Sequence, residues 1–317
     1  MLTFSLFIAG FVFLIKGADI LVEGASDIAR RLRISDLVVG LTIVAFGTSA
    51  PELAVNIIAS VEGNSGIAFG NIVGSNIANT LLILGAASFI YPIRVQKSTV
   101  YNEIPFSMLA ALVLFFMAND IIIDNRSENI LSRIDGFVML SFFSIFMYYI
   151  YTLARKGKIG EEIKSSGNVY KSVAYIILGA LGLYFGGDWI VTGAIEIART
   201  FGLGEDIIGL TIVAIGTSLP ELATSVVASL KKNSDIAIGN VVGSNIFNIF
   251  WVLGLSASIR PLPISKGNNP DILVVLFSAF LLFLFLYFMK QHTMKRWQGS
   301  VFLFGYVLYL YNLIFSR

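Results

Sequence analysis

Long apolar segments, separated by short polar loops, recur along the whole chain of 317 residues. Each segment has about 20 residues or more, which is the length that a helix needs to cross the hydrocarbon core of a bilayer. The pattern predicts an all-α integral membrane protein with ten transmembrane helices. The expected spans are 3–29, 37–60, 66–90, 100–118, 134–154, 171–198, 206–229, 236–258, 271–289 and 297–315.

The second half of the chain repeats the first. A shift of 169 residues aligns residues 17–92 with 186–261 without a gap, and about half of the aligned positions are identical. We expect a first five-helix repeat at 1–154, a short cytoplasmic linker at 155–170 and a second five-helix repeat at 171–317. Because five is odd, the second repeat enters the membrane from the opposite side, so the two repeats are expected to be inverted.

Positive charge is distributed unequally between the two sides of this layout. The loops after spans 1, 3, 5, 7 and 9 hold fifteen Lys and Arg residues, and the other side holds six. Lys and Arg collect in cytoplasmic loops. The count therefore predicts a multi-pass protein of the cell membrane with both termini extracellular.

One polar motif interrupts the second apolar segment, and its copy interrupts the seventh. The copies read Gly47-Thr48-Ser49-Ala50-Pro51-Glu52-Leu53 and Gly216-Thr217-Ser218-Leu219-Pro220-Glu221-Leu222. A charged glutamate at membrane depth costs about 3 kcal/mol on insertion scales, so two at equivalent positions indicate a function. Each proline removes a helical hydrogen bond, so helices 2 and 7 are expected to be broken. Broken helices at this depth line protein-enclosed or water-filled sites.

A second polar motif follows in the third and eighth segments. It reads Gly70-Asn71-Ile72-Val73-Gly74-Ser75-Asn76-Ile77-Ala78-Asn79 in one copy and Gly239-Asn240-Val241-Val242-Gly243-Ser244-Asn245-Ile246-Phe247-Asn248 in the other. Spacings of three and four residues place the polar side chains of each motif on one helical face. The candidate ligands are Thr48, Ser49, Glu52, Ser75, Asn79, Thr217, Ser218, Glu221, Ser244 and Asn248.

These candidate ligands offer only oxygen to a cation. Carboxylate, hydroxyl and amide oxygens suit Ca²⁺, Na⁺ or Mg²⁺ better than zinc or copper, and Mg²⁺ is disfavoured because it dehydrates reluctantly. The two carboxylates neutralise one divalent ion or two monovalent ions. The pattern therefore predicts one intramembrane cation site made from both halves of the chain.

Other polar residues receive structural interpretations. Asp19 and Asp188 are expected to be structural, with Lys16 as a candidate ion-pair partner of Asp19, and His292 is expected to be a solvated residue of a basic loop. The remaining asparagines of the second motif are expected to cap or brace helices: Asn71, Asn76, Asn240 and Asn245.

The paired motifs and the ten-span layout resemble the alpha repeats of the calcium/cation antiporter superfamily, and within it the sodium/calcium exchanger family of prokaryotic type. The resemblance covers nearly the whole chain, with alpha motifs at 40–85 and 209–254. It implies exchange of Ca²⁺ for Na⁺ by alternating access, with helices 1 and 6 sliding against the rest. Glu52 and Glu221 would bind Ca²⁺ and also serve Na⁺.

The resemblance also implies a role for each remaining ligand. The backbone carbonyls of Thr48 and Thr217 would bind Ca²⁺. The hydroxyls that would bind Na⁺ belong to Ser49, Ser218, Ser75 and Ser244. The carbonyls of Ala45 and Ala214 would complete the outer Na⁺ sites. Asn79 and Asn248 would fill the remaining polar corner, where relatives often carry an aspartate at one position. Two neutral asparagines weaken the case for potassium dependence.

Two alternatives remain open at this point: an H⁺-coupled antiporter of Ca²⁺ or another divalent cation, and a cation channel with passive flux. An enzyme is not expected, because no nucleophile is paired with a base and no phosphate-binding loop is present. The expected partners are Ca²⁺ and Na⁺ as substrates and the lipid bilayer, with no cofactor and no nucleic acid. A monomer should suffice for transport, since one chain supplies the whole site.

Overall fold

Helices make up nearly all of the fold. The computed structural model describes residues 2–156, 169–200 and 214–315, and eight continuous helices within them are long and apolar enough to cross a membrane. These are α1 (Leu2–Leu32), α5 (Ser65–Ile77) running through η2 (Ala78–Ile83) into α6 (Leu84–Ile90), η3 (Thr99–Glu103) with α7 (Ile104–Met117), α9 (Arg133–Lys156), α10 (Val169–Thr200), α14 (Ser234–Ile246) running through η5 (Phe247–Leu253) into α15 (Gly254–Ile259), α16 (Asn269–Phe288) and α17 (Arg296–Phe315).

A bent pair of helices, when it is counted as one span, brings the described part of the chain to nine spans. The segments Asp36–Thr48 and Ala50–Glu62 meet at an angle of 48°. The predicted all-α membrane fold is confirmed. The predicted span 206–229 lies partly outside the described residues, and its second part corresponds to the apolar helix α13 (Leu219–Leu230).

Both expected helix breaks are present, and each follows from its proline. Between α3 (Ala45–Thr48) and α4 (Ala50–Glu62), Ser49 leaves the helical region with φ −82° and ψ 6°. Ser218 does the same, with φ −87° and ψ 3°, between α12 (Ala214–Thr217) and α13. Each proline lies in the first turn of the following helix, where its missing N–H has no partner to lose.

Among the described residues, three π-helical stretches lie in or before the segments that carry the polar motifs. One, η1 (Gly40–Val44), follows the short helix α2 (Asp36–Val39) and leads into α3. The stretches η2 and η5 interrupt two otherwise α-helical spans at equivalent places in the two halves. Such wide turns commonly mark functional sites in helices.

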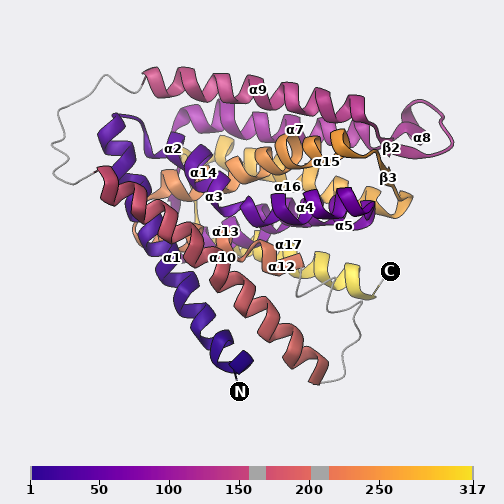
Figure 1. The fold of residues 1–317 in the computed structure, drawn as a ribbon. Coiled ribbons are helices and arrows are strands. Elements are labelled where there is room, and N and C mark those ends of the chain that lie inside the picture. The colour runs from indigo at the N-terminus through magenta and orange to yellow at the C-terminus, as the bar shows by residue number, and fades with distance from the viewer. Residues whose placement is uncertain (1, 157–168, 201–213, 316–317) are drawn as a thin grey trace.

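Helices α1 and α10 pack against each other in antiparallel fashion and lie at an angle to the other long helices (Figure 1). Glycines allow the close approach. A Cβ added at Gly17 would lie 2.8 Å from the Leu183 nitrogen, and one at Gly186 would lie 2.8 Å from the Gly10 carbonyl oxygen. Small residues drive this kind of packing in lipid, where apolar burial alone gives little preference.

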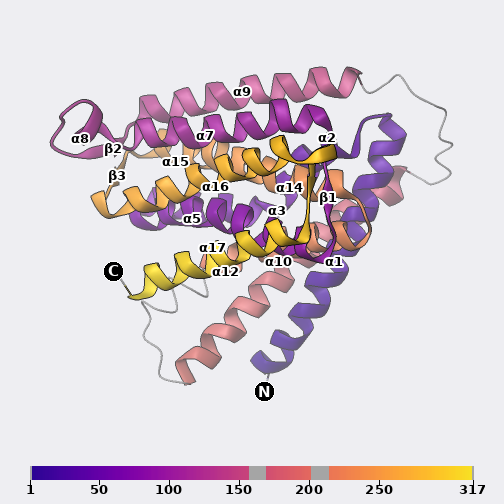
Figure 2. The same ribbon diagram turned by 180° about the vertical axis from the view of Figure 1, so that it is seen from behind.

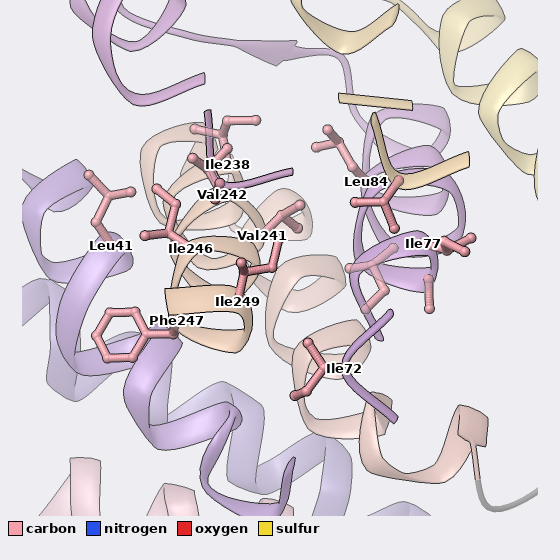
Figure 3. Packing of buried hydrophobic residues seen from close by; sticks show 14 of the residues in the cluster. Leu41, Ile72, Ile77, Leu84, Ile238, Val241, Val242, Ile246, Phe247 and Ile249 are labelled. Carbon is pink, nitrogen blue, oxygen red and sulfur yellow. The ribbon is translucent and has the colours of Figure 1, made fainter. Parts of the chain in front are cut away.

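The centre of the molecule is the segment Ser234–Ile259. Within its apolar window 94% of the residues are buried, compared with 33% for α1, so protein surrounds this helix while α1 faces outward. Leu41 lies on the side of this helix toward which its own Phe247 projects, and Ile72 and Ile77 lie on the other side (Figure 3). The polar motifs therefore run through the most enclosed part of the fold.

Two short antiparallel ladders tie the halves of the chain together. Strand β1 (Ile93–Arg94) pairs with β4 (Thr293–Met294), which follows the turn η7 (Lys290–His292) after α16 (Figure 2). Strand β2 (Asn129–Leu131), which follows the short helix α8 (Asp120–Ile123), pairs with β3 (Leu262–Ile264), and η6 (Lys266–Asn268) then leads into α16. Each ladder joins a first-half strand to a second-half strand.

Candidate cation-binding site

Two glutamates from the two broken helices are completely enclosed by protein. Glu52 lies in the first turn of α4 and Glu221 in the first turn of α13, and both are 0% exposed. Oε1 of Glu221 accepts a hydrogen bond from Ser49 at 2.9 Å, and Oε1 of Glu52 lies 3.5 Å from the Ser75 hydroxyl. Oε2 of each glutamate has no hydrogen-bond partner among the described residues, so each carboxylate keeps an oxygen for another ligand.

Serine hydroxyls connect each carboxylate to the other half of the chain. Ser49 Oγ lies 3.0 Å from Ser244 Oγ, and Ser218 Oγ lies 3.3 Å from Ser75 Oγ. All four serines are buried. The six predicted carboxylate and serine ligands therefore form two buried hydrogen-bonded groups, Glu221–Ser49–Ser244 and Glu52–Ser75–Ser218, and each group contains residues of both halves.

The two threonines are each held by an asparagine of the opposite half. Thr48 Oγ1 donates to Asn240 Oδ1 at 3.0 Å, and Thr217 Oγ1 donates to Asn71 Oδ1 at 3.2 Å. These hydrogen bonds hold the residue before each helix break against the opposite half of the chain. The expectation that Asn71 and Asn240 brace helices agrees with these contacts.

The predicted polar corner contains two asparagines in the π-helical stretches. Asn79 lies in η2 and donates to Asn245 Oδ1 at 3.1 Å, while its own Oδ1 has no partner among the described residues. Asn248 lies in η5, is fully buried, and has no partner for Oδ1 or Nδ2 in the described chain. Leaving such groups buried and unpaired costs about 1–3 kcal/mol each, which is typical of positions that meet a ligand.

The two predicted alanines lie at the beginning of the short helices before the breaks. Ala45 is buried at the start of α3, and its carbonyl accepts the Ser49 N–H at 2.9 Å and the Thr48 hydroxyl at 3.2 Å. Ala214 is the first residue of α12. The Ala45 carbonyl is thus already shared with protein donors, unlike the glutamate oxygens.

Sequence reasoning passed over one residue of this network. Asn56 is fully buried on α4; its Nδ2 donates to the Ala68 carbonyl at 2.8 Å, and its Oδ1 accepts from Asn71 at 2.7 Å. It therefore supports the asparagine that holds Thr217. The signal was its position four residues after Glu52, but its counterpart in the other half is Ser225, and this mismatch hid its role.

Two local expectations were wrong. Asp19 pairs with Lys231, whose Nζ lies 2.7 Å from both Oδ1 and the backbone carbonyl of Asp19, and not with Lys16. Periodicity along one helix cannot reveal a partner on another helix. His292 is partly buried, with Nδ1 3.0 Å from the Leu286 carbonyl, because the turn after α16 folds back on its helix.

A third buried acid lies outside this cluster. Glu103, at the end of η3, is 0% exposed and accepts a hydrogen bond from the Tyr149 hydroxyl on α9. The sequence analysis did not single it out because it lies at the polar edge of an apolar segment. Its partner is 46 residues away in the chain, so the pairing is a tertiary feature.

The fold and the site together define a multi-span membrane protein whose enclosed carboxylates and hydroxyls are positioned for cations. The family model for the sodium/calcium exchanger protein matches residues 2–152 and 171–315. The chain belongs to this family, whose members are transporters and not enzymes. The resemblance drawn from the sequence motifs is confirmed.

Similar proteins cover the chain from end to end. The sodium/calcium exchanger MaX1 of Methanosarcina acetivorans is 33% identical over 98% of each chain. The inner membrane protein YrbG of Escherichia coli is 35% identical over 82% of this chain and 81% of its own. A solved structure of the sodium-calcium exchanger NCX_Mj superposes with a TM-score of 0.84 at 33% identity, covering 100% of this chain and 99% of that one.

Proposed function

We propose that this protein exchanges Ca²⁺ for Na⁺ across the membrane by alternating access at the Glu52–Glu221 site. One observation carries the proposal. Two fully buried carboxylates lie in two broken helices, each is contacted by a serine hydroxyl, and each keeps one oxygen that no described protein group uses. The family and the similarity to sodium/calcium exchangers support the same conclusion.

Charge balance explains how one site can serve both ions. Two carboxylates in a protein-enclosed site of low dielectric constant attract cations strongly, and keeping both charged without a cation is energetically costly. One Ca²⁺ or two Na⁺ ions neutralise them equally. Replacing one load by the other therefore leaves the buried charge at the two glutamates unchanged, and Asn79 and Asn248 add no further charge.

Each proposed ligand has a place in this arrangement. Glu52 and Glu221 bind Ca²⁺ with both oxygens and also serve Na⁺, and the backbone carbonyls of Thr48 and Thr217 complete the Ca²⁺ site. The four serine hydroxyls and the carbonyls of Ala45 and Ala214 serve Na⁺, with Asn79 and Asn248 at the remaining corner. Carboxylate, hydroxyl and carbonyl oxygens are hard ligands, and such ligands suit both ions.

The proposed mechanism requires ten spans in two inverted repeats, residues 1–154 and 171–317. The antiparallel packing of α1 with α10, helices that are equivalent in the repeat alignment, supports the inversion. The two ladders support it too, since each pairs one half with the other. In this arrangement the α1–α10 pair slides against the remaining helices and exposes the site to one side at a time, with both termini outside and one chain sufficient.

The test is uptake of radiolabelled Ca²⁺ into liposomes that contain the purified protein. We expect uptake when an outward Na⁺ gradient is imposed, and no uptake without a gradient. Glu52→Gln and Glu221→Gln should each abolish it, because one lost carboxylate leaves a divalent ion unneutralised.

Parallel arms decide between this proposal and its competitors. Uptake driven only by a pH gradient would replace Na⁺ by H⁺ as the coupling ion. Rapid uptake that needs neither gradient would identify a channel. Glu23→Gln, an exposed change on α1, is the matched control and should leave Na⁺-driven uptake intact.

A further inference from the structure

A polar cavity of about 740 Å³ lies at the ends of several spans, away from the cation site. Four separate segments form it: Asp36 at the start of α2, residues 94–97 from the end of β1 onward, residues 231–235 from the end of α13 into α14, and Gln291–His292 after α16. The distribution of Lys and Arg assigns all four segments to the cytoplasmic face. Nothing in the cation-exchange reaction uses this cavity.

The cavity carries unbalanced positive charge. Of its four basic residues only Lys231 has an acidic partner in the described structure, Asp19 on α1. Arg94, Lys97 and Lys232 are exposed and form no ion pair with any described residue. Three cations without a carboxylate partner among the described residues thus line the cavity, and Lys97 also lies over the Tyr101 ring.

The two acids of the cavity are already stabilised by neutral groups. Asp36 accepts a hydrogen bond from the Asn233 amide at 2.8 Å, and Asp235 accepts one from the Gln96 amide at 2.7 Å. Their remaining acceptor capacity suits hydroxyl donors. Because the two acids offset part of the positive charge, the cavity matches a singly charged phosphodiester with hydroxyl groups better than a highly charged phosphate cluster.

An apolar groove of about 720 Å³ runs along the seam between α7 and α16. On α7 it is lined by Pro105, Met108, Leu109 and Leu112, and on α16 by Leu273, Leu276, Phe277 and Phe280. No polar side chain of the described residues lines it. A groove of this composition on the lipid-facing side of two spans fits a hydrocarbon chain.

Tyrosines connect the cavity to the groove. The exposed rings of Tyr101 and Tyr287 contact each other with centroids 5.9 Å apart, and Tyr101 also contacts His292, which lines the cavity. Pro105 follows Tyr101 by one turn, and Tyr287 follows Phe280 by two turns, so the two rings lie on the same helical faces as the groove, at its end toward the cavity. Exposed tyrosines at the ends of apolar spans mark the depth of lipid head groups.

We propose that this cavity and the adjoining groove bind one anionic phospholipid, with its phosphodiester head group held by Arg94, Lys97 and Lys232 and an acyl chain lying between α7 and α16. Basic pockets between spans on the cytoplasmic side are the usual places for such head groups. The groove distinguishes a lipid from a soluble phosphate, because only a lipid has a part that fills it.

The test is native mass spectrometry of the purified full chain, titrated with phosphatidylglycerol or with phosphatidylcholine. We expect one phosphatidylglycerol to be retained in preference to phosphatidylcholine. Arg94→Gln with Lys232→Gln should weaken retention on the order of 30-fold, because each basic side chain near an anionic head group contributes about fivefold. Leu112→Trp should also weaken it, by filling the groove.

Matched controls remove the same charge, or add the same ring, elsewhere. Arg155→Gln with Lys171→Gln, which removes two exposed cations from the same predicted face, and Val307→Trp on the exposed side of α17 should retain the lipid. Equal loss in the controls, or equal retention of both lipids, would overturn the site. If inorganic phosphate or glycerophosphoglycerol competes and Leu112→Trp binds normally, the ligand is a soluble anion and the lipid assignment is wrong. Size-exclusion elution of every variant shows that it is folded.

Discussion

Asn240 connects the two halves of the site through one side chain. Its Oδ1 accepts from Thr48, and its Nδ2 donates to the Ser225 hydroxyl at 2.9 Å. On the other side, Asn71 accepts from Thr217 and donates to Asn56. The amide is suited to this position because it both accepts and donates, which neither an aspartate nor a leucine of similar size can do.

Replacing Asn240 by alanine should therefore loosen the break in the helix that carries Glu52. We expect the apparent Ca²⁺ affinity to fall several-fold and the free energy of unfolding to fall by about 1–3 kcal/mol, since Thr48 and Ser225 lose their buried partner. Uptake kinetics and thermal unfolding measure the two effects.

A double-mutant cycle with Thr48→Val assigns the effect to this contact. The combined loss should be smaller than the sum of the single losses by about 0.5 kcal/mol or more, as for residues that share a hydrogen bond. Strict additivity would mean that the Asn240–Thr48 contact does not position the site.

The broken helices show how a single residue type decides the structure of an element. The chain leaves helical geometry at Ser49 and Ser218, one residue before the helices that begin with Pro51 and Pro220 in their first turns. These breaks could be predicted from the sequence because the loss of an N–H is a local property of proline. The π-helical stretches could not, because Asn79 and Asn248 carry no local signal that distinguishes a wide turn from an ordinary one.

Changing Pro51 to alanine restores a backbone donor at the break. We expect the angle of 48° between the two half-helices to decrease and Glu52 to turn away from Ser75. Ca²⁺ uptake should fall at least tenfold while helix content, measured by circular dichroism, stays the same.

Pro270→Ala is the control for this change, since Pro270 also lies in the first turn of a helix but is exposed and away from the buried glutamates. It should retain Na⁺-driven uptake. An active Pro51→Ala protein would show that the bend is not needed for transport.

Across the whole molecule, the sequence predicted the helices and the polar motifs within them, but it predicted few of the contacts between helices that are distant in the chain. The apolar segments predicted the described spans to within a few residues, and the paired motifs predicted six carboxylate and serine side chains that form buried hydrogen-bonded groups in the structure. The Asp19–Lys231 pair and the Glu103–Tyr149 contact could not be predicted, because each joins helices whose neighbours are set by tertiary packing.

The orientation of the molecule can be tested directly because the chain contains no cysteine. A single cysteine at Lys97 or Lys232 should react with a membrane-impermeant maleimide only when the cytoplasmic side is open, and one at Arg126 should react in intact cells. The expectation follows from the unequal Lys and Arg counts. The reverse pattern would place both termini inside, and a mixture would indicate dual insertion.

The wide turns η2 and η5 also set the rotational phase of the helices that follow them. An α-helix advances by roughly 100° per residue, so the additional residue in a π turn rotates everything after it relative to everything before it. Removing one residue from η5 would rotate α15 by about that angle, and Gly254, where an added Cβ would lie 3.1 Å from Met139 on α9, would no longer face its neighbour. One-residue deletions in these two stretches should therefore be far less tolerated than substitutions, so the chain's length there is constrained as tightly as its chemistry.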